Sequence, residues 1–337
     1  YYLWKSCKNF DIHSRVIGNK LTDGVRGATI NAIGSSLPEF FIALFFLFII
    51  KDINGFSSGL STILGSAIFN ILLIPAVVIF IVIKNNHDVI IRKRLILRDA
   101  GILLVSQIAL LFFLQDGIIS LVDSFYLFLL YIAYLLVLSK GGLFSKNNDK
   151  SKYNERRLSS WKNIVVSLIS ISILCLILVI SCEILFTGKF PEVLNFLDFS
   201  GGFGFDNIMY IALIFAAAAS SIPDLLISSL DAKKGDVDDA LSNPLASNLF
   251  DICIAFGIPL FIYTIFNGDI LLLDISSNVF DNIQSLIIIM ISITLLFLIS
   301  VMFSKKYRLL HTVFFVLLFI SFIVSIFHLD FISKNIL

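Results

Sequence analysis

The sequence predicts an all-α integral membrane protein built as an inverted-topology repeat. Three observations carry this prediction: the chain is too apolar for water, its apolar runs are long enough to cross a bilayer, and a pair of short motifs occurs twice. Hydrophobic residues make up 58% of the 337 positions, charged residues make up 15%, and the mean hydropathy is +0.97. Soluble domains carry about 25% charged residues, so we expect this chain to lie in lipid.

Nine apolar stretches are long enough to cross a hydrocarbon core of about 30 Å as helices. We expect these spans at approximately 25–50, 57–83, 95–114, 117–139, 163–186, 207–230, 240–266, 284–303 and 309–328. The chain opens on Tyr1, Tyr2, Leu3 and Trp4, and aromatic residues gather at membrane interfaces. We therefore expect an earlier helix before Tyr1, so that nine spans are visible and the first helix is missing from this sequence.

Lysine and arginine residues are distributed unevenly between the two sides of these spans. Twenty-two of the 25 lie on one side, in 1–26, 84–98, 140–162, 231–239 and 304–308. The other side holds Lys51, Lys189 and Lys334. Because positive residues favour the cytoplasmic side of a membrane, we expect the first group to face the cytoplasm.

The hydrophilic stretch 140–162, rich in Lys, Asn and Ser, is then a cytoplasmic linker between two membrane halves. We assign residues 1–139 to a first membrane repeat and residues 163–337 to a second. The acidic loop 231–239 on the same side is expected to be a solvated connection between helices, because its spacing does not match a calcium-binding helix-loop-helix.

Two short motifs occur once in each half of the chain. GSSLPE at 34–39 returns as ASSIPD at 219–224, and GSAIFN at 65–70 returns as ASNLFD at 246–251. The span with the first motif is expected to run outward from the cytoplasm, whereas the span with its counterpart runs inward. The halves therefore form an inverted repeat, in which substrate sites lie at the repeat interface near the middle of the membrane.

The first motif of each half ends in an acid within a predicted span, where a carboxylate is costly and usually faces an ion, a cavity or a partner. Pro38 and Pro223 each remove a backbone hydrogen bond. We expect the helices to break just before Glu39 and Asp224 and to free carbonyl oxygens there. In all four motifs a serine lies four residues before the final acid or amide, on the same helical face.

The motifs thus supply an all-oxygen set of donors: three carboxylates, an amide, serine hydroxyls and backbone carbonyls. Hard cations such as calcium take about six to eight oxygen ligands. No thiolate or imidazole is present in the motifs to select zinc or copper, and the four cysteines and four histidines have no metal-ligand spacing. The sequence predicts a site for a hard cation in the middle of the membrane.

These motifs resemble those of the calcium/cation antiporter superfamily, specifically the sodium/calcium exchangers. The resemblance covers approximately 27–75 and 216–260, and it implies ten helices in two inverted sets of five. It also implies that the ions are bound by Glu39, Asn70, Asp224 and Asp251, with supporting oxygens from Ser36, Ser66, Ser221, Ser247 and Asn248.

The motif SNLFD at 247–251 looks most like the potassium-dependent branch of that family. Three features depart from the family pattern. Ala43 stands where the family has a hydroxyl, Ala219 and Ala246 replace glycines, and Pro244 adds a kink. These departures bear on ion preference and leave the carboxylates in place.

The resemblance implies a secondary active antiporter, not an enzyme, that exchanges calcium for sodium by alternating access, with potassium co-transport as a variant. An antiporter of calcium or another divalent cation for protons is the alternative, because carboxylates can also titrate. A cation channel is disfavoured, since channels usually form a ring of identical subunits and this chain encodes its own repeat.

The expected partners are membrane lipid and inorganic cations. No nucleic acid is expected, and a formal net charge of +1 gives no reason for one. No cofactor is expected either, and the transported ions are calcium and sodium, with potassium as a variant. The cell membrane is the favoured location, an internal membrane is the alternative, and the oligomeric state is left open.

Overall fold

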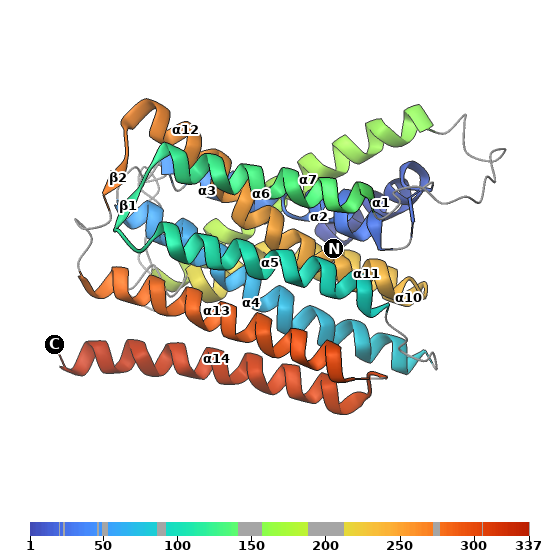
Figure 1. Cartoon of the computed structure of the whole chain (residues 1–337). Helices are drawn as coiled ribbons and strands as arrows, with labels where there is room; N and C mark the ends of the chain where they lie inside the picture. The colour runs from blue at the N-terminus through green and yellow to red at the C-terminus, as the bar shows by residue number, and fades with distance from the viewer. Residues whose placement is uncertain are drawn as a thin grey trace.

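The computed structural model describes residues 1–19, 21–22, 24–45, 47–48, 53–85, 92–140, 157–187, 212–271, 277–304 and 306–336. These residues are almost entirely helical (Figure 1). Most of the predicted linker, at 141–156, lies outside them, as do Lys51 and Lys189. The division into two repeats therefore stays a prediction.

The elements follow the order of the predicted spans. The first half contains α1 (Tyr2–Ile17), η1 (Gly27–Asn31), α2 (Ala32–Ser35), α3 (Leu37–Phe45), α4 (Ile53–Lys84), α5 (Lys93–Phe113), β1 (Ile118–Ile119) and α6 (Leu121–Lys140). The second half contains α7 (Arg157–Thr187), η4 (Ala212–Ala216), α9 (Ala217–Ser220), α10 (Ile222–Lys233), α11 (Val237–Phe250), η5 (Asp251–Phe256), α12 (Gly257–Asn267), β2 (Ile270–Leu271), α13 (Ser277–Phe303) and α14 (Leu309–Ile336). The three η elements are π-helical turns.

Six helices in the described part of the chain are long and apolar enough to cross a membrane: 59–84, 93–113, 121–140, 237–267, 283–303 and 309–326. A seventh candidate is the pair 213–220 and 222–233, which is bent by 45°. These coincide with seven of the nine predicted spans. The predicted spans 25–50 and 163–186 fall on η1, α2 and α3 and on α7, and their crossing of the membrane stays a prediction.

The centre of the bundle is formed by α4 and by the continuous segment α11, η5 and α12. In the most apolar stretch of each span, 72% of the residues are buried for 59–84 and 67% for 237–267, but only 17% for 309–326. Small side chains let these central helices meet closely. A Cβ atom on Gly65 would lie 1.9 Å from the carbonyl oxygen of Leu213, so glycine at this motif position lets η4 pass directly against α4.

The amphipathic helix α1 packs on the bundle from one side. Its buried residues Cys7, Phe10, Ser14 and Ile17 recur every three or four positions, the spacing that gathers side chains on one helical face. The apolar members of this face form a cluster with residues of α7 and α10, namely Ile164, Ile171 and Ile227.

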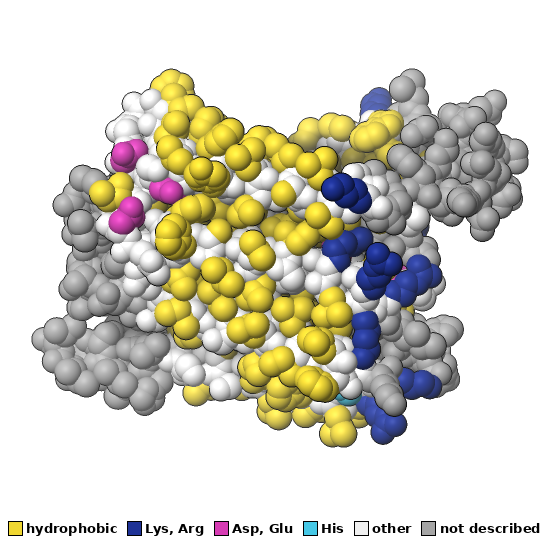
Figure 2. All heavy atoms as spheres, in the orientation of Figure 1, with side chains coloured by type: hydrophobic (Ala, Val, Ile, Leu, Met, Phe, Trp, Pro, Cys, Tyr) yellow, Lys and Arg dark blue, Asp and Glu magenta, His cyan; other side chains and the backbone are white. Residues whose placement is uncertain are grey.

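Figure 2 shows a broad band of hydrophobic side chains with lysine and arginine at one edge and acidic side chains at the other. Lys93 Nζ donates to the carbonyl oxygen of Met302 at 2.8 Å, and Arg92 pairs with Asp238 at 3.3 Å. These contacts join two connections that the sequence predicts to be cytoplasmic, 84–98 and 231–239, to the end of α13. β1 and β2 pair antiparallel at one end of the bundle (Figure 1).

We expect an impermeant thiol reagent, added to intact cells, to label a cysteine at position 269 and not one at position 94. Asp269 and Arg94 are both exposed, and the excess of basic residues directs the end with Arg94 to the cytoplasm. The variants Asp269→Cys and Arg94→Cys are made in a background without the four native cysteines, and permeabilised cells should label both. Labelling of position 94 alone in intact cells would reverse the orientation.

Candidate cation site

Both halves build the same local structure at their first motif. In the first half, η1 and α2 are followed by a break at Ser36 and then by α3, with Pro38 in its first turn. In the second half, η4 and α9 are followed by a break at Ser221 and then by α10, with Pro223 in its first turn. Proline cannot donate the backbone hydrogen bond that a continuous helix requires. The predicted helix breaks just before the acids are confirmed.

The breaks place Glu39 and Asp224 in the first turns of α3 and α10. The N-terminus of a helix carries a partial positive charge, which stabilises a nearby carboxylate. Both acids are at most 1% exposed. The local fold therefore offsets part of the free-energy cost of burying two negative charges.

Asp224 lies at the junction of the two halves. Its Oδ1 accepts a hydrogen bond from Ser247 Oγ at 2.6 Å, and Asn243 Nδ2 lies 3.5 Å from the same atom. Its Oδ2 accepts a hydrogen bond from Asn70 Nδ2 at 3.1 Å. The sequence placed Asp224 near the inner end of its span, and the bend between α9 and α10 brings it beside Asn70 of the other half.

The amide of Asn70 is held with its nitrogen occupied and its oxygen free. Besides its bond to Asp224, Asn70 Nδ2 donates to Asn248 Oδ1 at 2.9 Å, and Asn248 Nδ2 donates to the carbonyl oxygen of Ala67 at 3.0 Å. Asn70 Oδ1 is buried, and no hydrogen bond to it is found in the part of the chain that the structure describes. The network therefore orients one amide oxygen as an unoccupied ligand.

Glu39 is also only half satisfied. Ser66 Oγ lies 3.5 Å from Glu39 Oε1 and 2.8 Å from Ser221 Oγ. Glu39 Oε2 is buried, and no described residue makes a hydrogen bond to it. The hydroxyls at the two motif serines thus meet beside a carboxylate that has one oxygen atom unused.

Asp251 is the least satisfied of the three acids. It begins the π-helical turn η5 and is fully buried, and among the described residues no hydrogen bond to either carboxylate oxygen is found. The Ser36 hydroxyl lies 3.5 Å from the carbonyl oxygen of Ser247. Single π-helical turns of this kind are frequent at functional sites.

The unused oxygens define what the arrangement can do chemically. Burying a charge without a partner is costly, yet Glu39, Asn70 and Asp251 together leave four buried oxygen atoms without a hydrogen-bond donor. Among the described residues, no three His, Cys, Asp or Glu side chains already form a metal cluster. A cation here would therefore need amide, hydroxyl or carbonyl oxygens as well as carboxylates, which suits calcium and other hard cations.

All nine predicted ligand residues lie in or beside this junction, and the structure adds Asn243, which the sequence analysis missed. Asn243 Nδ2 donates to Ser228 Oγ at 2.9 Å and lies near Asp224, while Ser35 Oγ lies 3.4 Å from Asn243 Oδ1. The available signal was its position four residues before Ser247, on the same face of α11. Asn243 orients Asp224 rather than facing the unused oxygens.

A second buried acid, Asp99 of α5, was also missed. It is 1% exposed and lies four residues past the start of the predicted span 95–114, which by itself marks an unusual position. Arg98 binds both of its oxygens, at 2.7 and 3.0 Å, and the Tyr134 hydroxyl donates to it at 3.1 Å. Because these partners satisfy its charge, Asp99 ties α5 to α6 and does not join the site.

The expectation of a solvated loop at 231–239 holds only for its middle, where Lys233, Lys234 and Gly235 are exposed; it is wrong for the acids at its two ends. Asp231 is fully buried and Asp239 is 8% exposed. Both accept charged hydrogen bonds from Arg26, at 2.8 and 3.0 Å. The sequence analysis missed this because the partner lies about two hundred positions away along the chain.

Comparisons with known proteins address the family and the fold. The family described as "Sodium/calcium exchanger protein" matches residues 11–140 and 206–327. The sodium/potassium/calcium exchanger 3 of Rattus norvegicus is 36% identical over 118 residues, which are 35% of this chain and 18% of that protein. The inner membrane protein YrbG of Escherichia coli is 26% identical over 256 residues, 75% of this chain and 71% of that protein.

The matched segment thus spans less than a fifth of the exchanger relatives' length. Similarity in fold covers much more of the chain than this similarity in sequence. A structure of the sodium-calcium exchanger NCX_Mj, soaked with 10 mM Na⁺ and zero Ca²⁺, has a TM-score of 0.68 at 22% identity and covers 96% of this chain and 95% of its own. With the family match extending over most of both halves, the chain belongs to the sodium/calcium exchanger protein family.

Proposed function

We propose that this protein is a secondary active antiporter that exchanges calcium for sodium at a site formed by Glu39, Asn70, Asp224 and Asp251. The observation that carries the proposal is a set of four buried oxygens, where the motifs of both halves meet, that have no hydrogen-bond partner among the described residues. Supporting oxygens come from the hydroxyls of Ser36, Ser66, Ser221 and Ser247 and the amide of Asn248.

The charge of the site supports exchange rather than one-way passage. Three carboxylates supply up to three negative charges, which balance either several monovalent ions or one divalent ion with a second cation. One set excludes the other because both need the same oxygens. An empty cluster of buried carboxylates is costly to enclose, so the site should change sides only when it is occupied.

The inverted repeat provides a way to change sides, with the site at the interface between the halves. We assign the movement to α1 and α7. These helices are fastened to each other: Asn9 Nδ2 donates to Ser167 Oγ at 2.7 Å, and the His13 ring lies 3.1 Å from Ser160 Oγ. NCX_Mj, which shares the fold, has been studied for extracellular ion exchange and induced binding-site occlusion.

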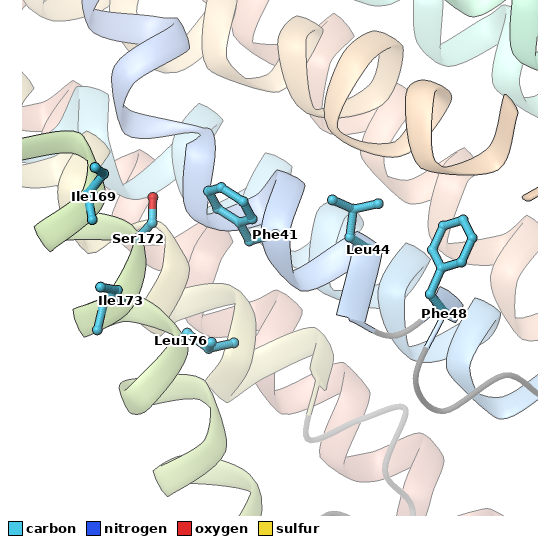
Figure 3. Close-up of a pocket in the computed structure, with 7 residues that line it drawn as sticks. All are labelled: Phe41, Leu44, Phe48, Ile169, Ser172, Ile173 and Leu176. Carbon is cyan, nitrogen blue, oxygen red and sulfur yellow. The ribbon is translucent and has the colours of Figure 1, made fainter. Parts of the chain in front are cut away.

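The contact between α7 and α3 is compatible with sliding. A pocket of about 450 Å³ lies between them. Figure 3 shows the side chains that line it: Phe41, Leu44, Phe48, Ile169, Ser172, Ile173 and Leu176. The lining contains a single hydroxyl, that of Ser172, and no hydrogen bond to it is found among the described residues. An apolar surface without hydrogen bonds resists translation less than a polar network does, because no donor or acceptor is left unpaired when it moves.

Potassium co-transport is the finer part of the proposal. Several relatives over part of this chain are sodium/potassium/calcium exchangers, at 36% identity over 118 residues and 43% over 63. Asp251 supplies a third carboxylate where the first half has Asn70. An extra negative charge accommodates an extra monovalent cation, and we assign potassium to it.

Calcium flux into sealed vesicles tests the proposal. The purified protein is reconstituted, and gradients of sodium, potassium and protons are imposed one at a time. An outward sodium gradient should drive calcium uptake several-fold above vesicles without a gradient, and a sodium ionophore should remove the effect. Uptake driven by a pH gradient alone would assign the proton-coupled alternative, and calcium entry without any counter-gradient would identify a channel.

A further inference from the structure

Seven charged side chains join α1 and the start of η1 to the turn between α10 and α11. We call them the inner cluster, because they lie on segments predicted to face the cytoplasm: Asp11, Arg15, Arg26, Asp231, Lys234, Asp236 and Asp239. Four acids meet three bases across a sequence separation of more than two hundred residues. The cluster therefore connects the N-terminal segment to the second half of the chain.

The outer part of the cluster fastens α1. Arg15 binds Asp11 in its own helix at 3.0 Å and also binds Asp231 and Asp236. Lys234 binds the second oxygen of Asp11. The side chains of Lys234 and Asp236 are 40% and 41% exposed, and that of Arg15 is 26% exposed. Water can therefore reach these pairs and replace them.

The inner part of the cluster is buried and fully paired. Arg26 contacts Asp231 and Asp239, both at 2.8 Å. Asp239 Oδ1 accepts hydrogen bonds from the backbone nitrogens of Gly24 and Gly27, both at 2.9 Å. Asn31 Nδ2 donates to Asp231 Oδ2 at 2.8 Å. This part fixes η1 against the start of α11.

The charge of Arg15 is maintained by its partners. Burial alone would lower the pKa of Arg15, but the negative charge of Asp231 and the hydrogen bond to Asp236 raise it above the ordinary value. The guanidinium group is therefore a permanent cation, and the pairs that it makes are charge-assisted hydrogen bonds, which are stronger than neutral ones.

A column of polar contacts leads from the cluster to the cation site. Asp231 lies two helical turns beyond Asp224 on α10. Asn31, which binds Asp231, has its carbonyl oxygen bound by Ser35 Oγ at 2.8 Å, and Ser35 Oγ lies 3.2 Å from Ser247 Oγ. The cluster thus lies between the predicted cytoplasmic surface and the carboxylates, at one end of this column.

We propose that the inner cluster is a latch that keeps the cytoplasmic route to the cation site closed and releases when α1 moves. The residues of the latch position α1 and do not bind the transported ions. The proposal rests on the proposed function for the nature of those ions and for the movement of α1. Its outer pairs break first because they are partly hydrated, whereas the buried pairs of Arg26 hold η1 in place.

The test uses charge reversal at Lys234, which is exposed enough to change without disrupting the core. Lys234→Glu places a carboxylate beside the buried Asp11 and should break the outer pairs by repulsion. Lys233→Glu is the matched control: it makes the same change one residue away, at an exposed lysine for which no ion pair is found among the described residues. Lys234→Arg keeps the charge and should behave like the parent.

Hydrogen–deuterium exchange in nanodiscs measures the opening without any transport. Amides in 24–36 and 231–247 should exchange about tenfold faster in Lys234→Glu than in the parent, Lys234→Arg or Lys233→Glu, which corresponds to about 1.4 kcal/mol of lost closure. Amides of α13 should not change. Equal exchange in Lys234→Glu and the parent, or equal acceleration in Lys233→Glu, would overturn the latch.

Measuring calcium affinity separately on each side of the membrane distinguishes a latch from a general loss of fold stability. In vesicles of known orientation, Lys234→Glu should lower the calcium concentration that half-saturates the cytoplasmic side and raise it on the other side. A uniform loss of activity with an unchanged ratio would contradict the proposal. If the parent does not exchange calcium, the proposed function fails, and the amide-exchange result still decides whether the cluster holds this route closed.

Discussion

Glu39→Gln and Asp224→Asn should each abolish calcium exchange while leaving the protein folded and inserted. Each substitution removes a negative charge and almost no volume from the junction of the two halves. Removing one partner of a buried charge pair costs about 3–5 kcal/mol, which lowers affinity by roughly two to four orders of magnitude. Asp224→Asn also leaves an amide where Asn70 and Ser247 now donate to two carboxylate oxygens.

The measurement is sodium-driven calcium uptake in reconstituted vesicles at matched protein density. Asp116→Asn is the control, because it makes the same chemical change on an exposed residue of the loop before β1. Glu39→Asp keeps the charge and should retain part of the flux. If either neutral variant, shown to be inserted and monodisperse, kept near-normal uptake, the assignment of the site would be wrong.

Asp251→Asn should keep calcium exchange at a reduced rate and lose its dependence on potassium. The carboxylate of Asp251 has no hydrogen bond of good geometry among the described residues, so an amide replaces it without breaking a network. A charge pair about 4 Å apart contributes about 4 kcal/mol at an effective dielectric constant of 20. Loss of this charge should therefore prevent the site from binding one monovalent cation.

Calcium uptake is compared with potassium present or absent on both sides of the vesicle membrane. In the parent, removing potassium should lower the sodium-driven flux by about tenfold or more, whereas the variant should respond little. Asn70→Asp is the reciprocal variant, since it gives the first half the carboxylate of the second. A parent that ignores potassium would assign a simple sodium/calcium exchanger and refute the role of Asp251.

Much of the site follows from signals that lie within one short segment. Pro38 and Pro223 break their helices because a proline has no amide hydrogen, whatever surrounds it. Each break then sets an acid in the first turn of the next helix, at Glu39 and Asp224. A hydroxyl four residues before an acid shares its face for reasons of helix geometry alone.

Contacts between distant segments did not follow from these signals. The acidic loop 231–239 was predicted to be solvated because acids between spans usually are. Asp231 is nevertheless buried, and it is paired with Arg26 from the other half. In the sequence, Asn243 is an ordinary polar residue of α11. Only the bend between α9 and α10 places Asp224 close to it. In both cases the deciding partner lies on another element, and periodicity carries no information about it.

The sequence by itself determined the membrane class, most of the spans, the repeated motifs and the oxygen chemistry of the site. All of these rest on local composition and on the fixed geometry of a helix. Tertiary structure alone decided which oxygens remain unpartnered, at Glu39, Asn70 and Asp251, and which charges neutralise one another in the inner cluster. The physical reason is that a buried charge takes its character from the groups packed against it, and only the packed fold selects those groups.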